Sequence, residues 1–312
     1  MNLKPQTQNI LYEHGKVFQN ITNLFDSNKL PNKILLSGVK GSGKATLAYH
    51  LINYIFSKNE KNTYNKNTKT INKDNRSFKL LLNGSHPNFY LVDLFDEKKS
   101  IEISQIRKMI NYTNKSSFNN LPKLVLIDNV ENLNLNSGNS LLKILEEPNE
   151  NVYFMLIYNN SKKILKTLKS RCINFNINLS FESSINITHK ILGKNPLDLI
   201  NNDLINYYNS PGHLLNFINF ANNNKIDLKE YNLKNFLSFL IEKNHYKKNE
   251  FIKLSIFNFI EHYFLKTFMI TNNKNKHLIL YSRFIKKIDN TIRFNLDLET
   301  LFMEFKSKIL NV

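Results

Sequence analysis

Residues 34–46 of this 312-residue chain, ILLSGVKGSGKAT, decide its fold. The apolar start predicts a buried strand, and a glycine-rich loop and the beginning of a helical pattern follow it. Glycines let backbone N–H groups turn inward around phosphate oxygens, the helix N-terminus adds positive potential, and Lys44 can reach the outer phosphates. The stretch therefore predicts a phosphate-binding loop. The residues expected to line it are Gly38, Gly41, Ser42, Gly43, Lys44, Ala45 and Thr46.

The loop lacks one group that such sites use for a metal. The hydroxyl that normally ligates Mg²⁺ belongs to the residue after the lysine, and this residue is Ala45. Thr46 comes one position too late and is turned by about 100° around the helix. We therefore expect no metal ligand set here, and Mg²⁺ binding that is weak or absent.

A second apolar run, residues 124–127, ends at Asp128, where an acidic residue can face a metal beside the phosphates. Capping of the loop after the strand is an alternative role for Asp128. The next residue is Asn129, whose amide cannot accept a proton from water, and Glu131 is displaced by two residues. We therefore expect that any ATP is bound without hydrolysis and that the chain itself is not catalytically active.

The hydrophobic pattern divides the chain into three parts. Up to residue 178, strand candidates alternate with helical patterns, which predicts an α/β domain with a parallel sheet. The candidate strands are 34–36, 89–92, 124–127 and 154–157, and the candidate helices between them are 46–56 and 103–112. Within this domain, residues 58–76 are rich in Asn and Lys and predict a mobile surface insertion, because they offer little apolar surface to bury.

The remaining two parts are predicted to be helical. Residues 179–225 form a small domain in which the pattern favours helices at 186–192, 196–208 and 212–221. Residues 226–312 form an all-helical bundle, because their apolar residues recur at helical spacing.

Composition narrows the class of protein. The chain carries 43 Lys and Arg against 25 Asp and Glu, a formal net charge of +18. Charge alone does not choose between nucleic acid and an anionic membrane surface. The 1 cysteine, Cys172, excludes an internal disulfide, as is typical of a reducing cytosol. We find neither a signal peptide nor an uninterrupted apolar span, so we expect a cytoplasmic protein without a membrane partner.

Five motifs occur in an order that makes the chain resemble a known family. They are GKATLA at 43–48, HP at 86–87, ISQIR at 103–107, NSLLKILEEP at 139–148 and SRC at 170–172. Together they resemble the delta-prime family of clamp-loader subunits of bacterial DNA polymerase III, within the AAA+ class. The resemblance covers residues 9–178 well and rests on the helical layout beyond them.

The resemblance implies a P-loop AAA+ domain, a helical lid and a C-terminal collar that joins a ring of five subunits. The implied partners are delta and gamma/tau subunits in a hetero-pentamer, with the sliding clamp and primer–template DNA reached through the complex. This complex carries the DNA-directed DNA polymerase, a nucleotidyltransferase of DNA replication. Many relatives also hold a four-cysteine zinc module after the first helix, and no zinc is expected here.

Two further site residues follow from the resemblance. Arg171, in the SRC motif, matches an arginine finger that stabilises the charge on a neighbouring subunit's ATP, and its alternative role is to anchor the turn before a strand. Asn159 matches a polar sensor of the γ-phosphate, and capping of the strand end is its alternative. His213 stands where ATP-hydrolysing relatives carry a sensor arginine.

The function that these features favour is a non-hydrolysing clamp-loader subunit that supplies Arg171 in trans during loading of the sliding clamp. Two alternatives stay open. The intact Gly43–Lys44 pair and Asp128 allow an ATP-hydrolysing AAA+ subunit or motor with an unusual site. A free-standing P-loop kinase is the other, and it would need an acceptor site.

Overall fold

The computed structural model describes residues 3–95, 98–206 and 209–310. The chain divides into two compact units, and each is described here by itself. The first unit comprises residues 1–188 together with 210–213, and the second comprises residues 189–209 together with 214–312. The helices α7 (Phe181–Leu192) and α9 (Pro211–Asn224) each contribute residues to both units.

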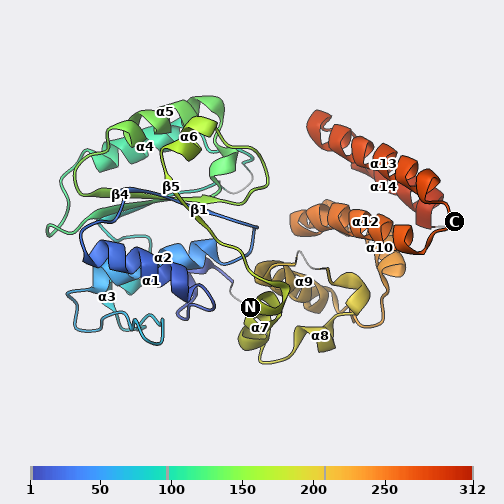
Figure 1. Ribbon diagram of the computed structural model, residues 1–312, viewed down its shortest axis with the longest axis horizontal. Coiled ribbons are helices and arrows are strands. Elements are labelled where there is room, and N and C mark those ends of the chain that lie inside the picture. The colour runs from blue at the N-terminus through green and yellow to red at the C-terminus, as the bar shows by residue number, and fades with distance from the viewer. Residues whose placement is uncertain (1–2, 96–97, 207–208, 311–312) are drawn as a thin grey trace. The chain divides into compact units, whose positions relative to one another are not determined.

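The first unit is built on a parallel sheet of five strands in the described residues, in the order β2-β3-β4-β1-β5 (Figure 1). The predicted strands are all present, each within two residues of its expected ends. The five strands are β1 (Lys33–Ser37), β2 (Phe89–Val92), β3 (Lys123–Ile127), β4 (Val152–Tyr158) and β5 (Ile173–Asn176). Because every pair is parallel, the segments that follow the strands all emerge at one edge of the sheet.

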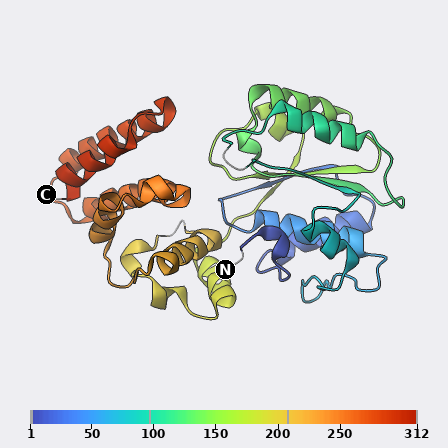
Figure 2. The ribbon, with the colours of Figure 1, turned by 180° about the vertical axis from the view of Figure 1, so that it is seen from behind.

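Helices cover both faces of this sheet (Figures 1 and 2). One face carries η1 (Pro5–Thr7), α1 (Gly15–Asp26), α2 (Lys44–Ser57) and α3 (Arg76–Leu82), and the other carries α4 (Ile103–Thr113), η2 (Val130–Asn132), α5 (Leu135–Glu146) and α6 (Lys166–Ser170). The strands supply both cores because successive side chains point to opposite faces. In β1, Ile34 and Leu36 enter the core under α1 and α2, whereas Leu35 enters the core with α4 and α5.

The segment 58–76 is packed more closely than its composition predicted. Tyr64 and Ile71 are buried, at 6% and 3% exposure, and both belong to the core that also holds Phe18. Glu60 accepts hydrogen bonds from Arg76 N at 3.0 Å and from the Ser77 hydroxyl at 2.5 Å, so its carboxylate caps the start of α3. The expectation that this segment buries little apolar surface is therefore wrong at these two residues, while its mobility stays a prediction.

The second unit is helical in its described residues. Its elements are the end of α7, α8 (Pro196–Leu199), η3 (Asn202–Leu204), most of α9, α10 (Leu233–Glu242), α11 (His245–Lys248), α12 (Glu250–Ile270), α13 (Lys274–Phe294), α14 (Leu298–Phe305) and the π-helical turn η4 (Lys306–Leu310). Rings of Phe217, Phe236 and Phe259 meet at centroid distances of 5.4–5.7 Å in its core. No helix among the described residues is both long and apolar enough to cross a bilayer.

One predicted helix, 196–208, is interrupted. Ile200 is extended, with φ −125° and ψ 137°, and separates α8 from η3. The Asn201 side chain accepts a hydrogen bond from Asp203 N at 3.0 Å, and such local bonds compete with a continuous helix. The last two residues of the predicted range, 207–208, lie outside the described residues. The predicted α/β fold with a parallel sheet followed by helices is confirmed, and its division at 178 and 225 stays a prediction.

Candidate nucleotide-binding site

The predicted loop lies directly after β1 and runs into α2, which begins at Lys44. Gly41 and Gly43 have φ of 81° and 87°, a left-handed conformation that glycine adopts without strain. With a side chain at either position the loop would be strained. The backbone of a phosphate-binding loop is therefore present, with the positive end of α2 behind it.

Lys44 is turned back onto its own loop. Its ammonium donates to the carbonyl oxygens of Gly38 at 3.0 Å and of Val39 at 2.7 Å, and the residue is only 2% exposed. Burial lowers the pKa of Lys44 to about 8, and the negative charges of Asp128 and Glu131 oppose this shift. The lysine that would reach the outer phosphates is thus held by carbonyl groups of the same loop.

The segment that opens α9 also contacts the loop, within the first unit. The Ser210 hydroxyl donates to the Lys40 carbonyl at 2.8 Å, and Gly212 N donates to the Gly41 carbonyl at 3.0 Å. A Cβ at Gly41 would lie 2.5 Å from the Ser210 hydroxyl oxygen. These contacts hold the start of α9 against the loop, and His213 is fixed there because its backbone N–H donates to Ser210 Oγ at 3.2 Å.

A chain of amide and carboxylate side chains crosses the carboxyl ends of β2, β3 and β4. Asn129 Nδ2 donates to Asp93 Oδ1 at 2.7 Å, and Asn159 Nδ2 donates to Asn129 Oδ1 at 2.9 Å. Asn129 is left-handed, with φ 55°, which Asn tolerates better than most residues. Asn159 therefore lies at the predicted edge of the sheet, where its side chain is held by Asn129.

The carboxylate of Glu131 holds the loop that follows β4. The residue is 8% exposed, and its two carboxylate oxygens accept from Asn159 N at 3.2 Å and from the Ser161 hydroxyl at 3.1 Å. Both oxygens are thus occupied by the loop that follows β4. This arrangement disfavours a role for Glu131 as the base that activates water.

Asp128 lies after β3, as predicted, in a less hydrated environment than a surface carboxyl. Burial, followed by the charge of Asp93, raises the pKa of Asp128 to about 7. The backbone N–H of Asn129, at 2.7 Å from Oδ1, and the charge of Lys44 act in the opposite direction. The carboxyl is therefore partly protonated near neutral pH, which weakens it as a metal ligand.

These residues fit a phosphate chain better than they fit a metal-dependent hydrolase. The Ser42 hydroxyl is buried without a hydrogen-bond partner, so the loop keeps a polar group that a phosphate oxygen could satisfy. Ala45 has no hydroxyl for Mg²⁺ and Asn129 offers no base. Within the described residues, no three His, Cys, Asp or Glu side chains gather as a metal site would require.

Arg171 lies at the amino ends of the strands, whereas the loop lies at their carboxyl ends. β5 pairs with β1 from Ile173 opposite Ile34 to Asn176 opposite Ser37, and Arg171 precedes this pairing at its amino end. Residues 34–38 of an extended strand rise by ~13 Å, which separates the two ends. The side chain is 34% exposed and contacts Glu146, with Nη2 at 2.6 Å from Oε1.

The structure thus brings the loop, Asp128 and Asn159 together at the carboxyl ends of the strands and places Arg171 at their amino ends. Reasoning from the sequence missed Asp93 and the partners of Glu131 and Arg171. Asp93 could have been found, because it follows β2 just as Asp128 follows β3. The contacts of Ser210 with Lys40 had no comparable signal, because 170 positions separate them in the chain.

A family model described as "DNA polymerase III, delta subunit" matches residues 13–180, more than half of the chain. The chain belongs to this family. Among relatives in the DNA polymerase III family, the delta' subunit of Buchnera aphidicola subsp. Schizaphis graminum is 27% identical over 288 residues, which cover 89% of this chain and 84% of that protein.

Two other relatives match this chain over shorter stretches. The delta' subunit of Pseudomonas aeruginosa is 32% identical over 98 residues, 31% of this chain and 30% of that protein. The gamma subunit of the same Buchnera is 33% identical over 193 residues, 61% and 50% of the two chains. A solved structure of a DNA polymerase III gamma subunit-related protein from Thermotoga maritima is 17% identical, covers 85% of this chain and 76% of its own, and has a TM-score of 0.40.

Proposed function

We propose that this chain is a clamp-loader subunit of the delta-prime type, which does not hydrolyse ATP and supplies Arg171 to the nucleotide of a neighbouring subunit. The partners would be delta and gamma/tau subunits in a hetero-pentamer, with the sliding clamp and primer–template DNA bound through the complex. Family membership and the named relatives support the assembly. Residues 1–178 would be the AAA+ domain, 179–225 the lid and 226–312 the collar.

The position of Arg171 carries the proposal. A guanidinium at the amino ends of the strands lies too far from the loop of its own chain, at their carboxyl ends, to serve it, and its side chain is 34% exposed. The adjoining strand β5 is an edge strand, and its Ile173 is 51% exposed. An arginine so placed can reach into another subunit's site and stabilise charge on a transferring phosphoryl group.

Two local features support the proposal that the chain's own site does not hydrolyse ATP. Ala45 lacks a hydroxyl, and Asn129 stands where a base would be needed. ATP would be held, where it binds, through the loop amides and Ser42, and it would not be hydrolysed.

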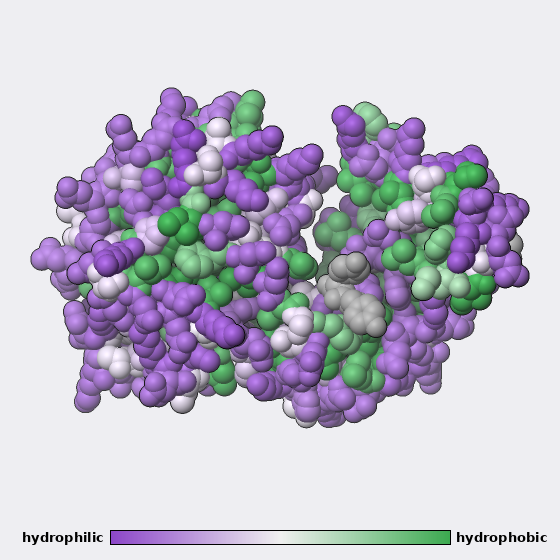
Figure 3. Space-filling model, viewed as in Figure 1, coloured by the Kyte–Doolittle hydropathy of each residue, from purple (hydrophilic) through white to green (hydrophobic). Residues whose placement is uncertain are grey.

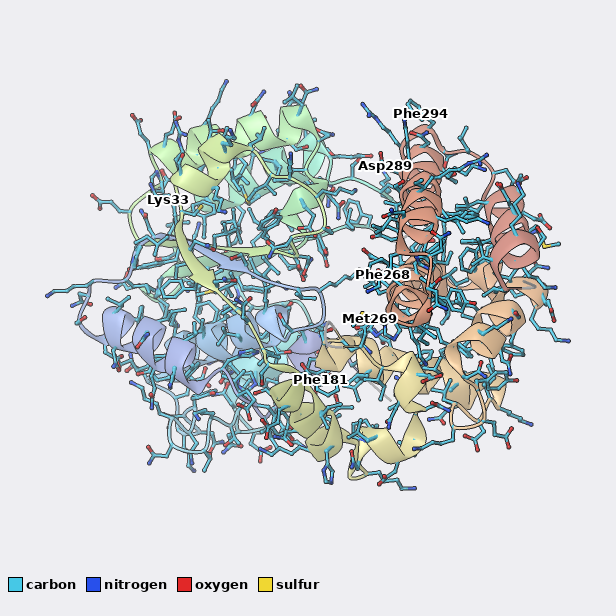
Figure 4. All side chains as sticks on the ribbon, turned by 45° about the vertical axis from the view of Figure 1, so that its right-hand side comes forward. Lys33, Phe181, Phe268, Met269, Asp289 and Phe294 are labelled. Carbon is cyan, nitrogen blue, oxygen red and sulfur yellow. The ribbon has the colours of Figure 1, made fainter. Side chains whose placement is uncertain are left out.

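Exposed apolar side chains in the second unit support its role in assembly. Met269 at the end of α12 and Phe294 at the end of α13 are 81% and 62% exposed (Figure 4), and Ile279 is 69% exposed. Figure 3 shows hydrophobic side chains, in green, on the surface of this unit. Apolar side chains that gather into a contiguous patch mark protein–protein contacts, whereas apolar residues that are exposed singly are normal.

The test is the ATPase rate of a loader reassembled with its partner subunits. To isolate one site, the other ATPase sites carry substitutions of their own loop lysines. We expect Arg171→Ala to lower turnover at the remaining neighbour site by about 10³-fold, since fingers are worth 10³–10⁵ in rate. Lys169→Ala removes an exposed charge from the same helix and is the matched control. Unchanged turnover with Arg171→Ala, at full assembly, would reject the finger.

A further inference from the structure

Two carboxylates lie at the C-terminus of α5, where the helix dipole disfavours negative charge. Glu146 is the last residue of α5 and Glu147 is its C-cap, and Lys143 is the basic residue in the last turn of the helix. Because the C-terminus of a helix is its negative pole, carboxylates there are unfavourable unless a cation is near. Two further cations come from elsewhere in the chain: Lys33 Nζ donates to the Leu145 carbonyl at 2.8 Å, and Arg171 forms an ion pair with Glu146.

The guanidinium of Arg171 is fixed at two points. Its Nη2 lies 2.6 Å from Glu146 Oε1, and its Nη1 donates to the Thr167 carbonyl at 3.0 Å. Arg171 N donates to the Leu168 carbonyl at 3.3 Å, so the backbone is held as the C-cap of α6. A guanidinium has five N–H donors in one plane. With two engaged, the other donors stay available on a side chain that is 34% exposed.

We propose that Glu146 is a positioning residue for the arginine finger, an inference that rests on the proposed function of Arg171. A free arginine side chain samples many rotamers, and ordering it when the neighbour's phosphate arrives lowers the rate of the catalysed step. Glu146 orders the guanidinium beforehand and leaves its other N–H groups for the phosphate. The helix α5 thereby sets the direction in which the finger points.

The test uses the reassembled loader with one active neighbour site, as for Arg171. We expect Glu146→Ala to lower kcat by about 2- to 10-fold, the range that corresponds to immobilising one long side chain. KM for ATP and the assembly of the complex should not change, because Glu146 does not contact the nucleotide. Glu146→Gln keeps a neutral acceptor at the same place and should give an intermediate kcat.

Two controls separate positioning from a structural role. Glu147→Ala removes the same charge one residue later, where no ion pair is found among the described residues, and should leave kcat unchanged. The thermal midpoint of the free chain should not fall in Glu146→Ala, since an exposed ion pair contributes little to stability. In an Arg171→Ala background, Glu146→Ala should have no further effect on kcat.

The outcomes distinguish the two proposals. Arg171→Ala without effect rejects the finger itself. Arg171→Ala with a large effect, but Glu146→Ala at the wild-type rate, leaves the finger and overturns positioning. A faster Glu146→Ala loader also overturns it, because Glu146 would then be holding the guanidinium away from the phosphate.

Discussion

At the scale of the residue, Asp128 makes the free energy of unfolding depend on pH. Burial raises its pKa to about 7, whereas the pKa of a carboxyl in the unfolded chain is about 4. Between these values the folded chain binds the extra proton, so the stabilising contribution of this group is fully present below about pH 4 and is lost as pH rises through about 7. We expect Asp128→Asn, which imitates the protonated form, to remove this loss. The free energy of unfolding of the variant, relative to that of the wild type, should be higher by roughly 1–3 kcal/mol at pH 7.5 than at pH 4.5.

The comparison is made by urea unfolding at both pH values, and Lys44, with its pKa lowered to about 8, begins to add its own dependence at the upper one. Asp74→Asn alters an exposed carboxylate, 78% accessible, and serves as the control. A gap between wild type and Asp128→Asn that stays constant with pH would show that the carboxyl is ionised in the folded chain throughout.

At the scale of the element, the segment 58–76 contributes to the core beneath the sheet. The Tyr64 ring stacks on Phe18 with centroids 5.1 Å apart, and its hydroxyl lies 2.9 Å from His50 Nδ1. We expect Tyr64→Ala to lower the free energy of unfolding by about 2–4 kcal/mol, because it removes a buried ring and leaves a cavity. Tyr64→Phe should cost less, about 1–2 kcal/mol, because only the hydrogen bond is lost.

Denaturant unfolding of the two variants measures both effects, and Lys61→Ala, in the exposed part of the same segment, is the control. Limited proteolysis of the wild type tests the predicted mobility separately. Wild-type stability in Tyr64→Ala would mean that the segment is a solvated insertion after all.

At the scale of the whole molecule, the prediction is that ATP turnover belongs to the assembly. The chain alone should hydrolyse no ATP above background, and Lys44→Ala should leave the turnover of the reassembled loader unchanged, because Ala45 and Asn129 leave this loop without a hydroxyl for Mg²⁺ and without a base. Coupled ATPase measurements on the isolated chain and on the loader check both statements. Robust turnover by the isolated chain, abolished in Lys44→Ala, would favour an ATP-hydrolysing AAA+ subunit or motor.

Co-purification addresses the remaining alternative. A free-standing kinase would not bind delta and gamma/tau subunits through residues 226–312. Retention of these subunits by the intact chain supports the loader, and failure to retain them favours a protein that acts alone.

The sequence by itself determined the local elements. The strands, the loop at 38–46 and the helix after it follow from apolar runs and glycine positions that act over a few residues. The order of the motifs indicated the family, and Asp128 and Asn159 fell at the ends of strands as expected. It erred where side chains compete with the backbone, as at Asn201, and where a polar segment buries single aromatic residues, as at Tyr64.

Only the tertiary structure decided what each charged group contacts. Lys44 donates to carbonyls of its own loop, and Glu131 holds the loop after β4. Arg171 forms an ion pair with Glu146 at the amino ends of the strands, away from the phosphate-binding loop. Most of these partners are tens of residues apart in the chain, so no local pattern records them. A charge taken from water needs the partner that lies nearest in space, and that neighbour is set by how the sheet and its helices pack.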